Sequence, residues 1–342
     1  MIRFECDYSE GAHEKIMQRL METNYEQTVG YSEDPYCASA REKIKIACDC
    51  PEAAVHFLVG GTQANATVIS SILRPHQGVL SAASGHINVH ETGAIEALGH
   101  KVLGLPHKDG KICAQQVRDY VAAHYADGSF EHIVQPGMVY ISHPTEMGTL
   151  YTLKELTDLS ETCRELEIPL FVDGARLGYG LTAGEVTLKD MAKLCDVFYI
   201  GGTKCGALFG EAVVITNKKL QKDFRYHIKQ RGGMLAKGRL LGLQFDTLFT
   251  DGLYEKITGN AARQALRIRE AFEKKGVKMH FDSPTNQQFP ELTQAQMDAL
   301  SKDFSFTYWE KAEGEYHAVR FCTSWATKDE SVEKLIAAIE AL

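Results

Sequence analysis

The sequence has no excess of basic residues. It carries 37 lysines and arginines against 45 aspartates and glutamates, and its formal net charge is -8. Because a protein that binds a nucleic-acid backbone needs a basic surface, this balance argues against nucleic acid as the main partner. The chain also lacks an apolar run near the ~18 residues that cross a bilayer, and its opening residues, MIRFECDYSEGAHE, hold no apolar signal-peptide core. We therefore expect a cytoplasmic protein with no membrane partner.

No C-x-x-C pair occurs among the nine cysteines. Cys48 and Cys50 stand close together, but no second pair accompanies them to complete a zinc site. Free thiols in a reducing compartment are the simpler interpretation. His86 and His90 have the i, i+4 spacing of a metal pair, yet neither an H-E-x-x-H motif nor a third ligand is evident, so we predict no metal.

The chain has 342 residues, which suggests two domains. After residue 50, short apolar runs alternate with segments of helical periodicity. The predicted strands are 53–60, 78–82, 101–106, 137–144, 168–175 and 207–217, with another contained within 191–202. The predicted helices are 62–76, 90–101, 114–126 and 152–167. This alternation predicts an α/β fold whose mostly parallel sheet is covered on both faces, with ligands at the carboxyl ends of the strands.

The pattern changes after about residue 230, where a second domain is predicted. Helices over 262–278 and 331–342 flank a strand over 318–325, and a long helix near 236–250 is expected to bridge the two parts. We predict an N-terminal arm (1–30), a large α/β domain (31–245) and a small C-terminal α+β domain (246–342).

One lysine stands out in the stretch DVFYIGGTKCGALFGEAVVI (196–215), where Lys204 lies between two apolar runs. A desolvated lysine has a lowered pKa, and its neutral amine can form a Schiff base with a carbonyl. The alternative is a lysine at a strand end whose ammonium group reaches solvent.

Three other stretches place polar groups after predicted strands. In FVDGAR, Asp173 can pair with a cationic ring nitrogen and Arg176 can bind a carboxylate, or the two can pair with each other. VGGTQAN matches neither the dinucleotide-binding nor the P-loop pattern. If a helix starts there, its backbone N–H groups can bind a phosphate. The alternative is an ordinary turn with a capping residue. In SGHINVHETGA, a histidine can stack on a cofactor, move a proton, or only satisfy local hydrogen bonds.

The order of these signals resembles the fold-type-I pyridoxal-phosphate enzymes, and more narrowly the threonine aldolase and aromatic amino acid β-eliminating lyase family. The resemblance covers nearly the whole chain. It rests on GYSEDP (30–35), GGTQAN (60–65), GHINVHETGA (85–94), FVDGARLG (171–178), GGTKCGALFG (201–210), QRGGM (230–234) and VRFCTSW (319–325).

The resemblance implies a role for each matching residue. Lys204 would hold pyridoxal phosphate as a Schiff base, Asp173 would pair with its ring nitrogen and His86 would stack on the ring. Gly61, Thr62 and Gln63 would bind its phosphate, with Arg231 reaching a phosphate across a subunit boundary. Arg176 and Arg320 would bind the substrate carboxylate near the Cys6-Asp7 segment, and Tyr31 and Glu91 would complete the pocket wall.

The function implied is cleavage of the Cα–Cβ bond of L-threonine or a related β-hydroxy-α-amino acid, in a homodimer or homotetramer with shared active sites. His86 is the first candidate for the base on the β-hydroxyl, followed by Glu91 and His143. Family members often carry Arg-Ser-Asp where this chain has Glu5-Cys6-Asp7. A β-eliminating lyase on the same scaffold is the nearer alternative, and a non-catalytic binding protein is the more distant one.

Overall fold

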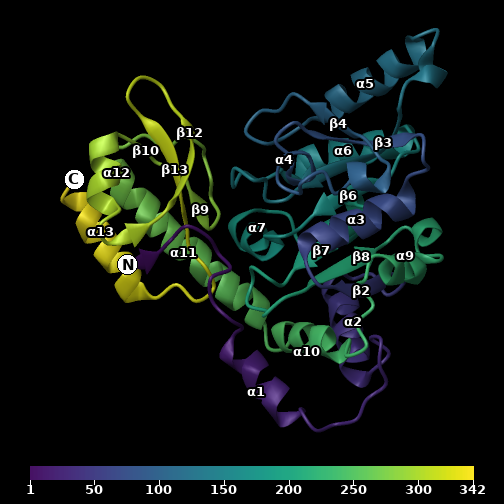
Figure 1. The fold of residues 1–342 in the computed structure, drawn as a ribbon, viewed down its shortest axis with the longest axis horizontal. Helices are drawn as coiled ribbons and strands as arrows, with labels where there is room; N and C mark the ends of the chain where they lie inside the picture. The colour runs from purple at the N-terminus through teal and green to yellow at the C-terminus, as the bar shows by residue number, and fades with distance from the viewer.

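This computed structural model describes all residues, 1–342, and contains two lobes (Figure 1). The larger lobe is built on a seven-stranded sheet of order β2-β8-β7-β6-β5-β3-β4. Its strands are β2 (Ala54–Leu58), β3 (Gln77–Ala82), β4 (Val102–Leu105), β5 (Gln135–Ser142), β6 (Leu170–Asp173), β7 (Val197–Gly201) and β8 (Glu211–Ile215). Only β8 runs against its neighbours. The prediction of a mostly parallel sheet is therefore confirmed.

The central strands are apolar on both faces because helices cover both. All five residues of β7 and of β8 are buried. Alternate residues of β6 enter different clusters, since Leu170 and Val172 belong to one core and Phe171 to the other. The covering helices are α2 (Pro35–Ala47), α3 (Gly61–Ile72), α5 (Ala114–Ala126), α6 (Leu153–Glu165), α7 (Leu177–Ala183), α8 (Leu188–Leu194), α9 (Phe224–Gln230) and α10 (Arg239–Leu248).

The helix predicted over 152–167 is present, whereas the helix predicted over 90–101 is not formed. Thr152 caps α6 by accepting a hydrogen bond from the Glu155 amide, while the Glu155 carboxylate accepts from the Thr152 amide. The helix predicted over 90–101 is wrong, because only α4 (His86–Val89) and the 3-10 turn η1 (Glu96–Leu98) form there. Positive φ angles at Thr92 (52°) and Gly93 (70°) interrupt the backbone between them.

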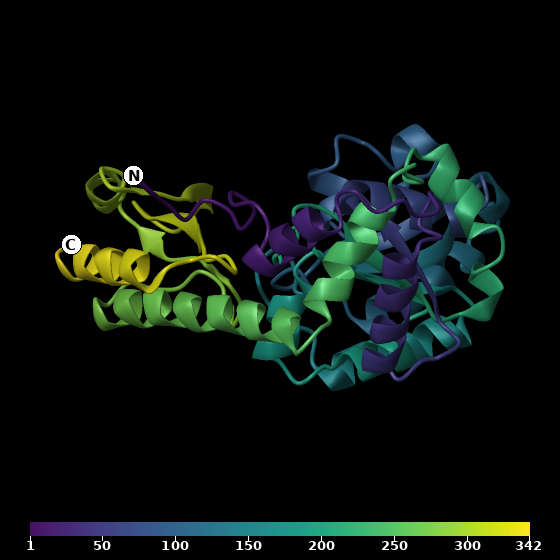
Figure 2. The same ribbon diagram turned by 90° about the horizontal axis from the view of Figure 1, so that it is seen from below.

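The smaller lobe combines an antiparallel sheet with two helices. Strands β10 (Glu291–Leu292), β13 (His317–Cys322) and β12 (Thr307–Lys311) pair in that order, and β9 (Gln287–Gln288) also pairs with β13. Helices α12 (Gln294–Leu300) and α13 (Asp329–Glu340) complete the lobe. The N-terminal strand β1 (Ile2–Arg3) pairs with β11 (Phe304–Ser305), and Phe4 enters the core of this lobe. The chain therefore begins and ends in the smaller lobe (Figure 2).

The bridge between the lobes is α11 (Leu253–Lys274), which packs on α7 of the larger lobe and on α13 of the smaller one. The bridging helix predicted near 236–250 is wrong in position, because α10 packs instead against α1 (Glu14–Glu22) and α2 within the larger lobe. The domain limits 31–245 and 246–342, with an arm before them, stay a proposal. None of the helices combines the length and the apolar content that a bilayer span requires.

Candidate active site

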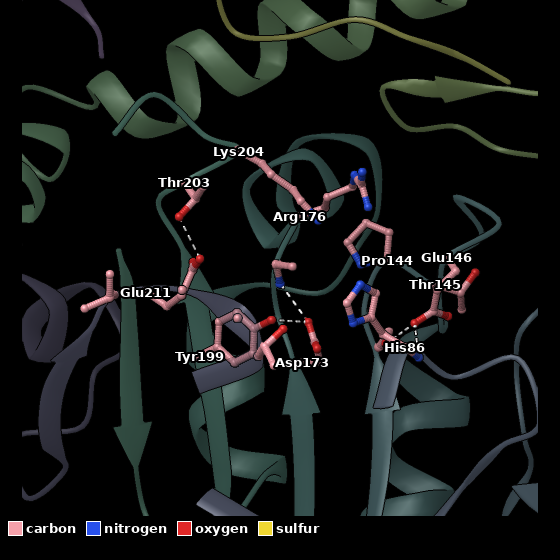
Figure 3. A pocket seen from close by; sticks show the side chains of 16 residues that line it. His86, Pro144, Thr145, Glu146, Asp173, Arg176, Tyr199, Thr203, Lys204 and Glu211 are labelled. Carbon is pink, nitrogen blue, oxygen red and sulfur yellow. Dashed lines mark hydrogen bonds between the residues drawn. The ribbon is translucent and has the colours of Figure 1, made fainter. Parts of the chain in front are cut away.

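A cavity of about 230 Å³ opens at the carboxyl edge of the sheet (Figure 3). The segments that follow β2, β5, β6 and β7 meet there, because these parallel strands all end at this edge. Strand β8 runs the other way, so its first residue, Glu211, lies at the same edge. An adjoining cavity extends toward the smaller lobe, and the two share His86, Glu146, Arg176 and Lys204 in their walls.

Lys204 follows β7 and faces both cavities. Its carbonyl oxygen accepts a 2.5 Å hydrogen bond from the Tyr179 hydroxyl, which fixes the backbone. Its amine contacts no carboxylate within 4.0 Å; instead it lies 5.9 Å from the centre of the Tyr8 ring. Burial and the neighbouring Arg176 guanidinium lower the pKa of Lys204. A lysine without an ion-pair partner and with a lowered pKa has the properties of a nucleophilic amine.

Asp173 ends β6, and four donors hold its buried carboxylate. Oδ1 accepts from the Tyr199 hydroxyl (2.5 Å) and the Ala175 amide (3.0 Å). Oδ2 accepts from the Tyr140 hydroxyl (2.6 Å) and from Asn65 Nδ2 (2.9 Å). Burial alone would raise the pKa of Asp173, but the charge of His86 and these hydrogen bonds outweigh it and lower the pKa. The carboxylate therefore stays anionic in a buried position.

A hydrogen-bonded chain connects this carboxylate to the histidine in the wall. Asn65 Nδ2 also donates to Glu91 Oε1 (2.7 Å), and the same oxygen lies 2.7 Å from Nδ1 of His86. Burial would lower the pKa of His86, but the Glu91 hydrogen bond and the charge of Asp173 raise it. Because the Glu91 side chain is fully buried, Glu91 positions His86 and does not itself line the cavity.

The predicted phosphate turn forms the start of α3. Gly60, Gly61 and Thr62 line the cavity, and the amides of the first turn of α3 have no acceptor in the protein. A side chain at Gly61 would place its Cβ 3.0 Å from the Tyr199 hydroxyl, so this position leaves little room for a larger residue. The Gln63 side chain turns away, bonding the Val59 amide and the Arg231 carbonyl.

Arg176 is already paired. Its Nε and Nη2 donate to the two oxygens of Asp7 at 2.7 and 2.9 Å, and Asn286 Nδ2 donates to the same carboxylate at 2.9 Å. Burial would raise the pKa of Asp7, but the charges of Arg176 and Lys204 lower it to about 2. Asp7 thus connects Arg176 of the larger lobe to Asn286 of the smaller one. Arg176 was predicted to bind the substrate carboxylate, but its Nε and Nη2 already bind Asp7.

Arg320 lines the second cavity and, like Lys204, has no carboxylate partner. It lies on β13, donates to the Gln287 side chain (3.2 Å) and the Glu5 carbonyl (3.0 Å), and stands 5.6 Å from the centre of the Trp309 ring. Its buried Nε has no partner. Two arginines therefore border the site from opposite lobes, but only Arg320 is free of a counter-charge.

Sequence reasoning missed several residues of the site: Asn65, Tyr140, Glu146, Tyr199 and Glu211. Glu211 accepts hydrogen bonds from the Gly202 amide (3.0 Å) and the Thr203 hydroxyl (2.8 Å). Glu146 Oε1 accepts from the His86 amide (2.9 Å) and the Ser142 hydroxyl (2.6 Å). Burial raises the pKa of both carboxyls, that of Glu211 to about 8. A charged residue at the head of the apolar run AVVI was the available signal for Glu211.

Other predicted residues lie outside the two cavities of this chain. The His143 residue is 1% exposed, and burial lowers the pKa of its ring to about 4. Tyr31 contacts Lys229 on another surface, at 5.1 Å from ring to amine. Cys6 Sγ lies 3.1 Å from the Ser9 hydroxyl. Arg231 accepts the Gln63 bond through its carbonyl, and its Nε has no partner.

The fold is that of the fold-type-I class of pyridoxal-phosphate enzymes, and a lysine and an aspartate lie at the carboxyl ends of its sheet. The histidinol-phosphate aminotransferase of Clostridium acetobutylicum shares the fold, with a TM-score of 0.76 at 13% identity over 100% of this chain and 98% of that one. The beta-eliminating lyase family model matches residues 6–295. The chain belongs to the beta-eliminating lyase family.

Relatives of known activity match over the whole length. The chain is 30% identical to the low-specificity L-threonine aldolase of Pseudomonas sp. (strain NCIMB 10558), covering 99% of this chain and 97% of that protein. It is 29% identical to the same enzyme of Pseudomonas aeruginosa, over 97% and 95%. A solved threonine aldolase from Leishmania major has a TM-score of 0.97 and 40% identity, over 100% and 99%.

Proposed function

We propose that this protein is a pyridoxal-phosphate-dependent aldolase that cleaves the Cα–Cβ bond of L-threonine or a related β-hydroxy-α-amino acid to glycine and an aldehyde. One observation supports this most directly: the unpaired Lys204 amine and the unpaired Arg320 guanidinium border one connected space. The lysine amine can bind the aldehyde of pyridoxal phosphate. The arginine can bind the carboxylate of an amino acid substrate. The full-length threonine aldolase relatives support the same reaction.

The residues present fit pyridoxal phosphate. The first-turn amides of α3 are free to bind a phosphate, Lys204 is free to bind the aldehyde, and the anionic Asp173 suits a ring nitrogen that carries a proton. His86 stands in the same wall and would stack on the ring. When bound, the cofactor supplies an electron sink for bonds at Cα.

The protein's own residues would then orient the substrate and move its protons. Arg320 binds the substrate carboxylate, with the remaining N–H groups of Arg176 beside it, and so sets which bond at Cα is cleaved. A base must take the β-hydroxyl proton. His86 is poorly suited because Glu91 and Asp173 favour its protonated form. Glu146 is better suited, since its Oε2 accepts no hydrogen bond from the protein and its carboxylate has no cation partner.

Tyr31 and Arg231 fit a shared active site in a homodimer or homotetramer. Both lie outside the cavities of their own chain, and Tyr31 is 46% exposed. In such an assembly each would reach the site of a neighbouring subunit, with Arg231 directed at the phosphate. Their positions are consistent with the shared site proposed from sequence.

The test combines a visible spectrum with product analysis. The protein is mixed with L-threonine, and acetaldehyde, glycine and 2-oxobutyrate are measured, with Lys204→Ala as the matched control. Acetaldehyde and glycine in equal amounts, both absent from the control, are the expected result. Formation of 2-oxobutyrate would show β-elimination instead, since loss of the hydroxyl leaves the Cα–Cβ bond intact. No cofactor band and no product from several β-hydroxy amino acids would overturn the proposal.

A further inference from the structure

The carboxylate of Asp173 accepts as many hydrogen bonds as its two oxygens can take. Oδ1 accepts from the Tyr199 hydroxyl at 2.5 Å and from the Ala175 amide at 3.0 Å. Oδ2 accepts from the Tyr140 hydroxyl at 2.6 Å and from Asn65 Nδ2 at 2.9 Å. An ionised carboxylate offers about four lone-pair sites, so these four donors fill them. A further donor that approaches Asp173 must therefore displace one of the donors already present.

The two oxygens differ in their relation to the cavity. Tyr199 and Ala175, the donors to Oδ1, belong to the cavity wall (Figure 3). Tyr140 and Asn65, the donors to Oδ2, are fully buried and belong to the wall of neither cavity. Oδ1 is therefore the oxygen on the side from which a ligand approaches.

Of the two donors to Oδ1, only the Tyr199 hydroxyl can turn away in place. The Ala175 amide belongs to the backbone two residues after Asp173, so its direction is set by the chain. A hydroxyl hydrogen rotates about its C–O bond while the ring keeps its position. Because Tyr199 lines the cavity, its hydroxyl can then donate to another acceptor there. The Tyr199 hydrogen bond is thus the one that a ligand can replace without moving the backbone.

We propose that the Tyr199 hydroxyl and the ring nitrogen of the bound cofactor compete for the same lone pair on Oδ1 of Asp173. This inference rests on the proposed function, which supplies a ligand whose ring nitrogen carries a proton. The hydroxyl turns away from Asp173 when the ring N–H donates to Oδ1. Tyr199 therefore weakens the binding of a ligand that has this N–H group and leaves the binding of a ligand without it unchanged.

The size of the effect follows from the bond that is displaced. A hydrogen bond to an ionised group is stronger than one between neutral groups, so the ligand loses part of its affinity in replacing Tyr199. Phenylalanine keeps the ring and lacks the hydroxyl, so Tyr199→Phe leaves one lone pair of Oδ1 open to the ring nitrogen. We expect the contribution of the ring nitrogen to the binding constant to rise about tenfold in this variant.

Two probes isolate the ring nitrogen. The first is pyridoxal phosphate, and the second is its analogue in which a C–H group replaces the ring nitrogen. Both carry the aldehyde and the phosphate, so the contributions of Lys204 and of the first turn of α3 cancel in their ratio. Dissociation constants of both are measured by equilibrium dialysis at pH 7 with the cofactor-stripped full-length protein. The ring-nitrogen advantage is the constant of the analogue divided by that of pyridoxal phosphate.

Tyr140→Phe is the matched control, because it removes a hydroxyl from the same carboxylate on the side away from the cavity. We expect the ring-nitrogen advantage to rise about tenfold in Tyr199→Phe and to change less than threefold in Tyr140→Phe. An unchanged or smaller advantage in Tyr199→Phe overturns the inference, because the hydroxyl then supports the contact. An equal rise in Tyr140→Phe also overturns it, because loss of any donor to Asp173 would then suffice.

A measurement on the unaltered protein covers the case in which Tyr199→Phe does not fold. With tyrosine labelled by carbon-13 at Cζ, the chemical shift responds to the acceptor of each hydroxyl. We expect one tyrosine signal to differ between the complexes with the two probes, and identical tyrosine spectra would overturn the inference. If neither probe binds, the proposed function falls and the inference with it. If both bind with identical spectra, only the inference falls.

Discussion

Replacing Asp7 with asparagine tests the connection between the two lobes. Asp7 is fully buried, and its carboxylate binds Arg176 of the larger lobe through two hydrogen bonds and Asn286 of the smaller lobe through one. Asparagine keeps the shape but removes the charge, so Arg176, whose side chain is 11% exposed, would be left without a counter-charge. Removing one partner of a buried ion pair is strongly destabilising.

The magnitude follows from the pKa of Asp7. Its pKa falls from an ordinary 3.8 to about 2 in the folded protein. At about 1.4 kcal/mol per pKa unit, the folded environment favours the charged carboxylate by about 2.5 kcal/mol. A depressed pKa contributes stability above pH 3.8 and loses it as the pH falls through 2. We therefore expect Asp7→Asn to lose about 2.5 kcal/mol of unfolding free energy at pH 7, and less in acid.

Urea unfolding, followed by circular dichroism, measures this loss, and a thermal scan should show a midpoint lower by about 3 °C for a chain of this length. Glu165→Gln is the matched control, because it breaks the exposed pair of Glu165 with Arg118 and should change stability far less. An Asp7→Asn protein as stable as the control at pH 7 would refute the reasoning. It would mean that Arg176 finds solvent or another acceptor once the carboxylate is gone.

Four further variants test the site. When pyridoxal phosphate is added, Lys204→Ala should show only the band of the free aldehyde and not the shifted band of a Schiff base, and a shifted band would exclude the covalent role of Lys204. Arg320→Lys should raise KM for the amino acid about tenfold or more, because a point charge replaces a planar fork, and an unchanged KM would place the substrate carboxylate elsewhere. Asp173→Asn should lower kcat about 10²- to 10³-fold with an unaltered far-ultraviolet spectrum, and wild-type turnover would contradict the electrostatic role. Glu146→Gln should lower threonine cleavage by about 10²-fold or more, yet leave exchange of the glycine α-proton with D₂O unchanged, because glycine has no β-hydroxyl. Loss of both activities would show that Glu146 maintains the site instead of moving that proton.

The sequence by itself determined the kind of sheet and the neighbourhood of the site. Apolar runs followed by Gly60-Gly61, Asp173 and Lys204 predicted strand ends, and strands that run in parallel bring their ends to one edge. The helix predicted over 152–167 corresponds to α6, which begins just after its cap Thr152. In contrast, the prediction of a helix over 90–101 was wrong. The apolar periodicity of that stretch gives no sign of the positive φ angles at Thr92 and Gly93, which interrupt the helix.

Only the tertiary structure decided which charges are free. Arg176 and Arg320 look alike in sequence, yet Asp7, 169 residues from Arg176 along the chain, neutralises one and leaves the other unpaired. Glu211 has no distinguishing motif within the strand predicted over 207–217, but the reversed direction of β8 places it at the cavity. His143 is a candidate base by sequence, but its ring is 1% exposed and belongs to the wall of neither cavity. Partners distant in sequence and the direction of a strand depend on how the whole chain packs, and local sequence patterns do not contain that information.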